Sequence, residues 1–363
     1  MEEKFMKRLA SVVGPTLVCV LAAWSVFART ESTSARLNAA PEESANYSVR
    51  RLPLPDNNSG DIAMDYIAYD PGTNSVWVPA GNTGAVDVVD AATGKVRQIT
   101  GFPTGEMEIG GAKHVVGPSS VSIGEGVVYI GSRGDFSICA VNSRSLARGA
   151  CGRIDSMPDG IAYVAPTKEV WVISNKDSSV RVLDGKTLEQ KEKLTFDGTP
   201  EGFTVDARHG RFYTNLEDKD RTLAIDVKTR KTVSTWDPAC GKDGPRGLQV
   251  DPAAGHLIVA CTTQVKVLDA GHDGAVLSQL DTGAGVDDMG YVPATHTLYV
   301  GAARAAKLTI ARLDEKGQFT IVAQVPTPDG ARNAVVAKDG TIYMAHWRFV
   351  NFSGLFVVSP GGK

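Results

Sequence analysis

Seven copies of one repeat limit the fold of this chain more than any other feature of its sequence. Each copy holds four short runs of alternating polar and apolar residues joined by tight turns, the pattern of four antiparallel strands. The centre of the second run recurs 52, 42, 42, 45, 41 and 44 residues apart, at Trp77, Tyr129, Trp171, Tyr213, Ile258, Tyr299 and Tyr343. This pattern predicts an all-β fold, a seven-bladed β-propeller with four antiparallel strands per blade, spanning residues 46–363.

The two ends of the repeat region predict how the ring closes. The last copy supplies three strands, the third at 355–358, and the tail of Ser, Pro and Gly after it offers no fourth. The segment Tyr47–Leu52 alternates and is followed by Pro53 and Pro55, which cannot donate a ladder hydrogen bond. We predict that this amino-terminal strand completes blade 7 and removes the open sheet edges of the ring.

The first 45 residues have the pattern of an export segment followed by a tether. Lys4, Lys7 and Arg8 precede an uncharged stretch at 9–28, which ends in residues that suit signal peptidase. This predicts a signal peptide over 1–28 and a periplasmic or secreted protein. The alternative is an uncleaved membrane anchor over 9–28, which is just long enough to span a bilayer. Residues 29–45 are polar and aperiodic, which predicts a flexible linker.

Export makes disulfide bonds possible, and the four cysteines after Cys19 fall into two local pairs. Cys139 and Cys151 lie in the predicted third and fourth strands of blade 2. Cys240 precedes the first strand of blade 5, and Cys261 follows its second. We therefore predict the disulfides Cys139–Cys151 and Cys240–Cys261. No CxxC or CxxCH motif occurs, which excludes zinc ribbons and covalently attached c-type haem.

Composition and motifs exclude several other classes of protein. The formal net charge is −3, so the chain lacks the surplus of Lys and Arg that general nucleic-acid binding requires. It has no Gly-x-Ser-x-Gly nucleophile motif and no nucleotide-binding glycine loop. We predict no metal site and no cofactor. The alternating acids of 217–220 suggest a Ca²⁺ site, but the interleaved Lys219 and Arg221 argue against one.

The repeat resembles the YVTN type of YncE-like propeller proteins. The resemblance is carried by stretches such as Ile67-Ala68-Tyr69-Asp70-Pro71 with Ser75-Val76-Trp77-Val78, and Val86-Asp87-Val88-Val89-Asp90 with Thr93-Gly94-Lys95. It covers nearly all of residues 46–363, and the seven-bladed lactonase-like propellers are similar more distantly. The resemblance implies an exported propeller. It implies no single activity, because the family includes binding proteins and enzymes alike.

Function is expected at one face of the ring, which we call the top face. This face carries the turn from each outer strand to the next inner strand and the loop from each second strand to the third, around the opening of the central channel. Its candidate residues are Arg133, Asp159, Glu201, Asn215, Arg246, Asp287, Asp288, Arg304, Arg332, Asn333, His346 and Arg348. Among these we expect Arg246 and Arg332 to face the channel near Asp287 or Glu201.

The charges of the top face permit two interpretations. They form either a ring of salt bridges between blades or a site for a small anionic ligand, whose carboxylate or phosphate arginine binds bidentately. Arginine-rich surroundings are expected to keep Asp159, Glu201 and Asp288 ionised, which suits a general base and not a general acid.

One top-face loop, 101–117, is longer than its equivalents by about ten residues. Its glycines predict mobility, and Glu106, Lys113 and His114 are its candidate contacts above the channel. A loop longer than its equivalents often carries function. The alternative is a loop that packs on blade 2 without a functional role.

The sequence therefore predicts an exported, monomeric propeller that binds a small anionic ligand or a protein partner through its top face. The alternative is an enzyme, either a lactone or ester hydrolase or a lyase, that uses the arginines and carboxylates of the same face. Contact with a membrane is expected only if residues 9–28 are retained as an anchor.

Overall fold

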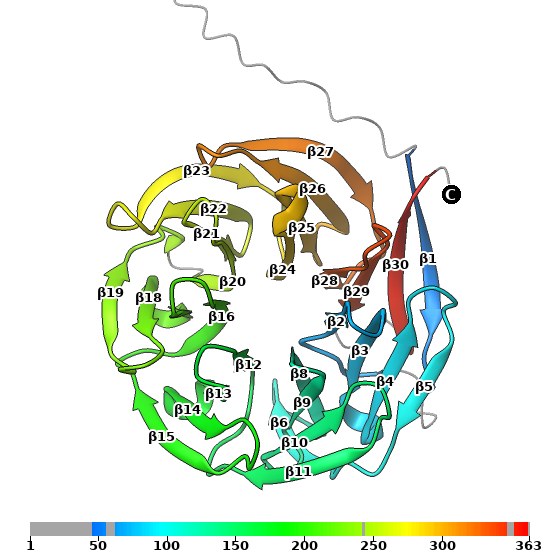
Figure 1. The fold of residues 1–363 in the computed structure, drawn as a ribbon. Helices are drawn as coiled ribbons and strands as arrows, with labels where there is room; N and C mark the ends of the chain where they lie inside the picture. The colour runs from blue at the N-terminus through cyan, green and yellow to red at the C-terminus, as the bar shows by residue number, and fades with distance from the viewer. Residues whose placement is uncertain (1–45, 56–61, 242–243, 347–351, 362–363) are drawn as a thin grey trace, which may run out of the picture. The chain divides into compact units, whose positions relative to one another are not determined.

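The computed structural model describes residues 46–55, 62–241, 244–346 and 352–361. Their main strands form seven antiparallel sheets of four strands each, placed in succession around a central channel (Figure 1). This confirms the predicted seven-bladed β-propeller. The signal or anchor segment predicted over 1–28 and the linker at 29–45 lie outside the described residues. No helix in the described ranges is long and apolar enough to cross a bilayer.

Each blade runs from an inner strand beside the channel to an outer strand at the rim. The strands of blades 1 to 4 are, in this order, β2 (Ala68–Asp70), β3 (Ser75–Ala80), β4 (Ala85–Asp90) and β5 (Val96–Ile99); β8 (Pro118–Gly124), β9 (Val127–Ser132), β10 (Ser137–Asn142) and β11 (Arg148–Arg153); β12 (Ile161–Val164), β13 (Glu169–Ser174), β14 (Ser179–Asp184) and β15 (Gln190–Thr195); β16 (Pro200–Asp206), β17 (Arg211–Leu216), β18 (Arg221–Asp226) and β19 (Thr232–Trp236).

The same order of strands continues through blades 5 to 7. These strands are β20 (Pro245–Asp251), β21 (His256–Cys261), β22 (Gln264–Asp269) and β23 (Ala275–Asp281); β24 (Val286–Val292), β25 (Thr297–Ala302), β26 (Lys307–Leu313) and β27 (Phe319–Pro326); β28 (Ala331–Val336), β29 (Ile342–His346), β30 (Gly354–Pro360) and β1 (Tyr47–Pro53). Short 3-10 turns occur in connecting loops at η2 (Gly81–Thr83), η3 (Asn175–Asp177), η4 (Glu217–Lys219) and η6 (Pro293–Thr295).

The amino-terminal strand closes the ring, as the sequence predicts. β1 pairs antiparallel with β30 over its whole length, from Tyr47 opposite Pro360 to Pro53 opposite Gly354. In Figure 1 the two strands, from opposite ends of the chain, lie side by side as the outer half of blade 7. Blade 7 thereby gains the fourth strand that the other blades form from continuous chain.

The hydrophobic core is divided into seven clusters, and each of them joins two neighbouring blades. Trp171 of blade 3, for example, is fully buried, and its ring lies 4.8 Å from that of Phe212 in blade 4. Apolar burial contributes roughly 25 cal/mol for each Å² removed from water, so it stabilises the contacts between blades as well as each sheet. A ring held in this way depends on every blade being complete.

In five blades an Asp ends or directly follows the third strand, and its carboxylate holds the hairpin turn. Asp184 Oδ1 accepts the backbone N–H groups of Lys186 and Thr187, both at 2.9 Å. Asp90, Asp226, Asp269 and Asp314 accept backbone N–H groups in the same way. These turns lie on the bottom face, which explains why this recurring acid has a structural role.

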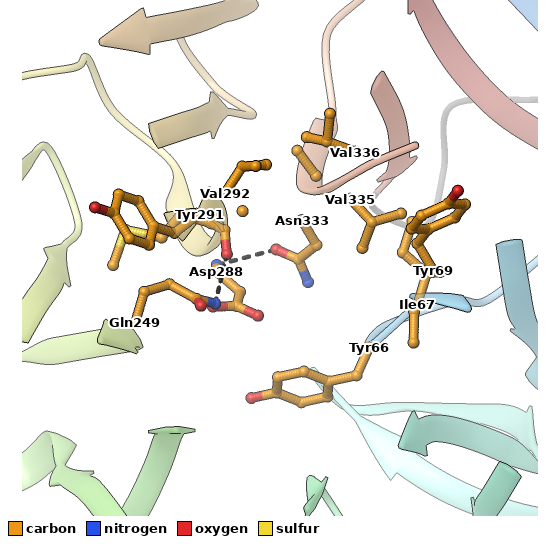
Figure 2. Close-up of a pocket in the computed structure, with 14 residues that line it drawn as sticks. Tyr66, Ile67, Tyr69, Gln249, Asp288, Tyr291, Val292, Asn333, Val335 and Val336 are labelled. Carbon is orange, nitrogen blue, oxygen red and sulfur yellow. Dashed lines mark hydrogen bonds between the residues drawn. The ribbon is translucent and has the colours of Figure 1, made fainter. Parts of the chain in front are cut away.

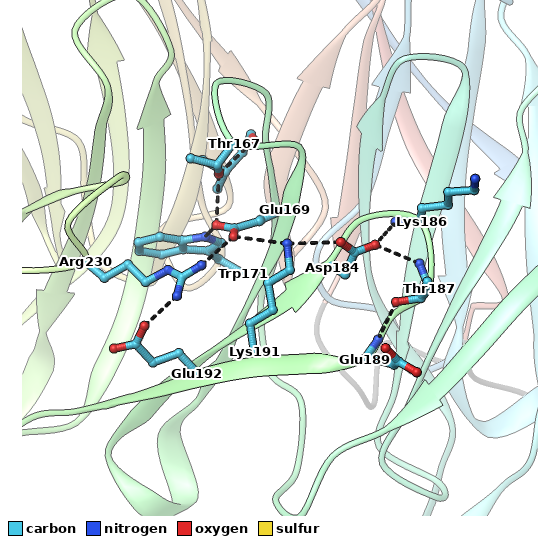
Figure 3. Close-up of polar contacts among 11 residues, drawn as sticks. Thr167, Glu169, Trp171, Asp184, Lys186, Thr187, Glu189, Lys191, Glu192 and Arg230 are labelled. Carbon is cyan, nitrogen blue, oxygen red and sulfur yellow. Dashed lines mark hydrogen bonds and ion pairs between the residues drawn. The ribbon is translucent and has the colours of Figure 1, made fainter.

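Polar contacts on the bottom face also connect blades 3 and 4 (Figure 3). Glu169 begins β13 and is buried, yet it accepts hydrogen bonds from Trp171 Nε1 at 3.2 Å and from Arg230 of blade 4 at 2.6 Å. Burial opposes ionisation of this carboxyl, but Trp171, Thr167 and Arg230 outweigh it, and the pKa of Glu169 is lowered. Glu169 is therefore a fully satisfied structural carboxylate.

Both predicted disulfides are present. Cys139 in β10 bonds Cys151 in β11, which lie opposite each other in the ladder. Cys240 bonds Cys261 at the end of β21, so this bond ties the segment before β20 to the top face.

Removing either disulfide should destabilise the protein measurably. The bonds span 12 and 21 residues of chain, for which the chain-entropy model predicts a loss of about 3 kcal/mol each. Chemical denaturation of the Cys139→Ser/Cys151→Ser and Cys240→Ser/Cys261→Ser variants measures this loss. Peptide mapping without reduction checks the pairing, and a cross-link between the two pairs would contradict the structure.

Candidate functional site

The mouth of the channel on the top face forms where the inner strands begin. In blade 6 the pairing register shifts between Val286 and Met289 of β24, and similar shifts occur near the starts of β16, β20 and β28. A bulge of this kind lets two successive residues face the same side of a sheet. It brings both Asp287 and Asp288 to the channel, and we call this ring of blade entrances the channel mouth.

Two arginines and three aspartates form a continuous chain of ion pairs across the channel mouth. Arg133 of blade 2 lies 2.8 Å from Asp65 of blade 1 and also pairs with Asp159 of blade 3. Arg332 of blade 7 lies 2.6 Å from Asp287 and 3.4 Å from Asp65. Arg332 thus faces the channel beside Asp287, as the sequence predicts, and its guanidinium already has carboxylate partners.

Removing the Arg133 charge should leave Asp159 without its cation and Asp65 with only the longer contact to Arg332. Arg133→Met is expected to lower the free energy of unfolding by about 3 kcal/mol near neutral pH, because breaking a buried pair leaves an uncompensated charge. The loss should shrink in acid, where Asp159, whose pKa is raised by burial, takes up a proton. Urea denaturation measures it, and Arg144→Met, an exposed arginine in the same blade, is the control. Equal stability of the two variants would contradict this account.

Asn333 holds the bulged ends of three blades together. Its amide donates to Asp287 at 3.1 Å and to Asp65 at 3.4 Å, and its oxygen accepts the backbone N–H of Asp288 at 3.0 Å. The backbone of Asn333 has a φ of 47°, a left-handed conformation that Asn tolerates better than most side chains. Asn333 is therefore a positioning residue for Asp288.

Two other candidates connect blades 4 and 5. Arg246 was expected near Asp287 or Glu201, but its guanidinium pairs instead with Glu217 of η4, at 2.7 Å. Asn215 is fully buried, and its amide donates to the backbone oxygen of Arg246 at 2.6 Å while its oxygen accepts from Thr222 at 2.7 Å. Asn215 thus packs between blades and does not reach the channel.

The remaining candidates of the second-to-third loops are not gathered at the mouth. Arg304 lies exposed in the turn between β25 and β26. His346 is fully buried in blade 7, with its ring 6.0 Å from that of Phe352 and 5.6 Å from that of Phe356. Arg348 lies outside the described residues.

The long loop is a regular β-hairpin and not an irregular segment. β6 (Gly105–Ile109) pairs with β7 (Ala112–Val116) through a turn at Gly110 and Gly111, both with positive φ. Glu106 and Lys113 are exposed and pair with each other at 3.2 Å, while His114 is half-buried on the opposite face of the hairpin. The glycines therefore make a tight hairpin turn.

The carboxyls of the channel mouth do not behave as the sequence suggested. Asp159, Glu201 and Asp288 were expected to stay ionised beside arginine, but the pKa of each is raised. Burial raises the pKa of Asp288 to about 7. Burial, with Asp159 and Asp287 nearby, raises the pKa of Glu201 well above its ordinary value. For Asp159, burial outweighs the ion pair with Arg133, whereas Glu201 and Asp288 have no guanidinium partner among the described residues.

Glu201 and Asp288 are consequently the two acids of the mouth without a cation. No side chain in the described part of the chain forms an ion pair or a hydrogen bond with either carboxyl, and Asp288 accepts one backbone N–H, that of Met289. Glu169 on the bottom face, also buried, has four side-chain donors (Figure 3). Glu169 therefore stabilises the fold, whereas the carboxyls of Glu201 and Asp288 are available to bind a ligand or a proton.

A cavity of about 320 Å³ lies in the channel, and Asp288 and Asn333 are among the residues that line it (Figure 2). It is lined by the inner strands of blades 5, 6, 7 and 1, through Gln249 and the stretches 66–69, 288–292 and 333–336. This volume is at the lower end of the range for small-molecule sites, and the lining combines apolar side chains with a few polar groups.

Tyr66 reaches across the channel from blade 1 toward blade 4. It comes from blade 1, yet its ring centroid lies 5.5 Å from that of Phe203 in blade 4. Burial raises the pKa of its hydroxyl well above the ordinary value, and among the acids Glu201 adds most to this rise. Sequence reasoning missed Tyr66 and Gln249. The signal for Tyr66 was its place at a blade entrance, where blades 3 to 5 have Gly160, Gly202 and Gly247.

Comparison with known proteins identifies the fold only. No family model and no curated protein sequence matches the chain. Among solved structures, the hydrazine synthase of Kuenenia stuttgartiensis superposes with a TM-score of 0.68 at 16% identity, covering 85% of this chain and 97% of that one. A streptogramin B lyase gives 0.67 at 13% identity, covering 88% and 100%, and a chain of a mitotic checkpoint complex gives 0.67 at 13%, covering 89% and 97%. At such identities the likeness shows a shared propeller fold.

Proposed function

We propose that this protein is an exported β-propeller that binds a small molecule in the channel cavity. The observation that carries the proposal is a cavity of about 320 Å³ lined by the Asp288 carboxyl, which has no cation partner among the described residues. Buried polar groups are normally satisfied, so those left over in a cavity mark a place for a ligand. A protein partner seated on the top face is the alternative occupant, since propellers also serve in multi-protein assemblies such as the checkpoint complex.

The proposal of export rests on the amino-terminal segment and is supported by the two disulfides. Residues 1–28 have the pattern of a signal peptide, and disulfides persist in oxidising compartments. We propose a periplasmic or secreted monomer of the YVTN type on the strength of the repeat motifs. Membrane attachment through residues 9–28 is the alternative.

An enzymatic role is the second candidate, and Asp288 is the observation that favours it. Its pKa of about 7 allows the carboxyl to take up or release a proton near neutral pH, which a general acid or base requires. Among the structural neighbours, the streptogramin B lyase is an enzyme on this fold. A lyase or a lactone or ester hydrolase would use Asp288 for proton transfer at the same cavity.

A thermal-shift screen with a cavity-filling variant tests the proposed function. Val335→Phe places a ring in the cavity, and Val276→Phe adds the same volume on the exposed outer strand β23. Sugar acids, lactones, phosphates and amines form the screen. A true ligand should raise the melting temperature of the natural protein and of Val276→Phe, but not of Val335→Phe. Shifts that persist in Val335→Phe, or none in any protein, would contradict the proposal.

A further inference from the structure

Most of the polar groups that line the channel cavity already have partners. The hydroxyl of Tyr69 donates to Asn74 at 2.7 Å and accepts the backbone N–H of Lys338 at 3.2 Å. The hydroxyl of Tyr291 donates to Asp251 at 2.6 Å. Both contacts are made outside the cavity lining, so these two residues offer the cavity mainly their ring carbons.

The amide side chains are also committed, but unequally. Asn333 uses both ends of its amide on Asp287, Asp65 and the backbone of Asp288. Gln249 donates its Nε2 to the backbone oxygen of Met289 at 2.8 Å, and Figure 2 shows this contact beside Asp288. Its Oε1 keeps its capacity to accept a hydrogen bond.

Three polar groups of the cavity therefore have capacity left to meet a ligand: Gln249 Oε1, the Tyr66 hydroxyl and the Asp288 carboxyl, which accepts the backbone N–H of Met289 and can accept further hydrogen bonds. Once Asp288 is ionised, its carboxylate and Gln249 Oε1 can accept hydrogen bonds but cannot donate them. None of the described lining residues is Lys, Arg or His. The guanidiniums of the mouth, Arg133 and Arg332, pair with Asp65, Asp159 and Asp287. An anion entering the cavity would face a carboxylate with the Tyr66 hydroxyl as the one side-chain donor in the described lining.

We infer that the channel cavity selects an organic cation, a primary amine whose ammonium group is held by Asp288 and Gln249. The inference rests on the proposed function and names the class of its ligand. An ammonium supplies the donors that these two acceptors lack, and the faces of Tyr66 and its neighbours favour a cation. The apolar body of the amine would lie against Met289, Val335 and Val336.

A metal ion fits the cavity less well than an amine. Divalent metals require several oxygen or nitrogen ligands at short range. The cavity offers one carboxyl and one amide oxygen, and no group of three His, Cys, Asp or Glu arranged for a metal occurs among the described residues. Carboxylate, amide oxygen and aromatic rings together suit an ammonium group on an apolar skeleton.

The inference predicts that amine binding strengthens as pH rises through about 7. The cation binds the ionised form of Asp288, whose pKa is raised to about 7, so protons must leave for the amine to bind. The other charged groups facing Asp288 are Asp287 and Asp65, which raise its pKa, and Arg332, which lowers it. On the neighbouring strand β20, Gly247 lies against Asp288, and the charged residue next to it, Arg246, is paired with Glu217.

The test compares ligands that share one carbon skeleton. 2-Phenylethylamine, 2-phenylethanol and phenylacetate head a panel of small amines, each measured by calorimetry with its matched alcohol and carboxylate. At about pH 8 the amine should bind at least about tenfold more tightly than its alcohol, and the carboxylate should not bind measurably. Affinity for the amine should fall by up to about tenfold per pH unit below pH 7.

Two variants assign the effect to the cavity. Asp288→Asn should weaken amine binding at least about tenfold at pH 8, far more than it weakens alcohol binding, and should abolish the pH dependence of amine binding. Gln249→Leu leaves the Asp288 carboxylate in place, so it should weaken amine binding while preserving its pH dependence. This variant provides the test if Asp288→Asn does not fold. Glu108→Gln, an exposed acid on the β6–β7 hairpin, is the control for general electrostatic attraction and should change nothing.

The outcomes separate this inference from the proposed function. If alcohols or carboxylates bind as well as amines, and Val335→Phe abolishes their binding, the cavity is a ligand site and the cationic class is wrong. If amines bind equally to Val335→Phe and Asp288→Asn, their site lies elsewhere and both proposals fail. Amines that bind no better than their alcohols anywhere in the panel overturn the inference.

Discussion

Replacing Asp288 with Asn is expected to stabilise the ligand-free protein at about pH 8 and to leave its stability nearly unchanged at about pH 4. The folded-state pKa of Asp288, about 7, lies above the ordinary value of 3.8, so folding opposes ionisation of this group. Stability is therefore lost as pH rises from about 4 to 7 and stays low above that range. Asn removes the cost, which we put at about 2 kcal/mol after allowing for partial solvent contact.

Glu169→Gln is the matched control, with the opposite sign. Its folded-state pKa is lowered, so the ionised carboxylate stabilises the fold above the ordinary pKa and loses this effect as pH falls. Glu169→Gln should thus lower the melting temperature at about pH 8 and have less effect in acid. Thermal melts of both variants across this pH range provide the measurement. A lower melting temperature for Asp288→Asn at about pH 8 would show that its carboxylate has an unrecognised partner.

These two acids show why a carboxyl that destabilises the fold points to function. Glu169 is buried with donors supplied by its own strand and by blade 4, and it contributes to stability. Asp288 is held at a bulge by Asn333, itself in a left-handed conformation, and faces a cavity without a cation. Sites that break the local rules of stability are where binding and catalysis are expected.

The fold was predictable because the same four-strand pattern recurs seven times. Five of the seven copies have an Asp where the third run ends and the hairpin turn begins, and the aromatic centres mark the buried second strands. The closing strand was predictable from what the last blade lacked, and the disulfides followed from strand adjacency. The 101–117 hairpin was not recognised, although Gly110-Gly111 between short alternating runs is a hairpin signal.

The location of the charged residues of the site was predictable from the sequence, but their ion-pair partners were not. Sequence placed Asp287 and Asp288 at a blade entrance, but they are neighbours with different roles: Asp287 pairs with Arg332, and Asp288 does not. A bulge and one asparagine decide which carboxyl receives the cation, and neither is visible in the repeat. The expectation of an anionic ligand rested on the number of arginines at the top face, because their carboxylate partners cannot be read from the sequence.

Deleting the closing strand should have the largest effect on stability of any change considered for this protein. A chain beginning at residue 46 keeps the full ladder between β1 and β30 and should melt like the natural protein. A chain beginning at residue 56 loses that ladder, the buried side chains of Leu52 and Leu54, and the hydrogen bond from Leu54 N to Ser353. Burying each leucine contributes about 2 kcal/mol, and the ladder adds to this loss.

The shorter chain should therefore melt more than about 10 °C lower, or aggregate, because β30 becomes an exposed edge strand. Point variants in the same strand separate packing from length. Leu52→Asp places a charge between blades 7 and 1 and should reproduce much of the loss, whereas Val49→Asp lies on the exposed face of β1 and should not. Circular dichroism melts and size-exclusion chromatography provide the measurements. If the two truncated chains melt alike, another segment must complete blade 7, and the closed ring described for β1 and β30 does not hold in solution.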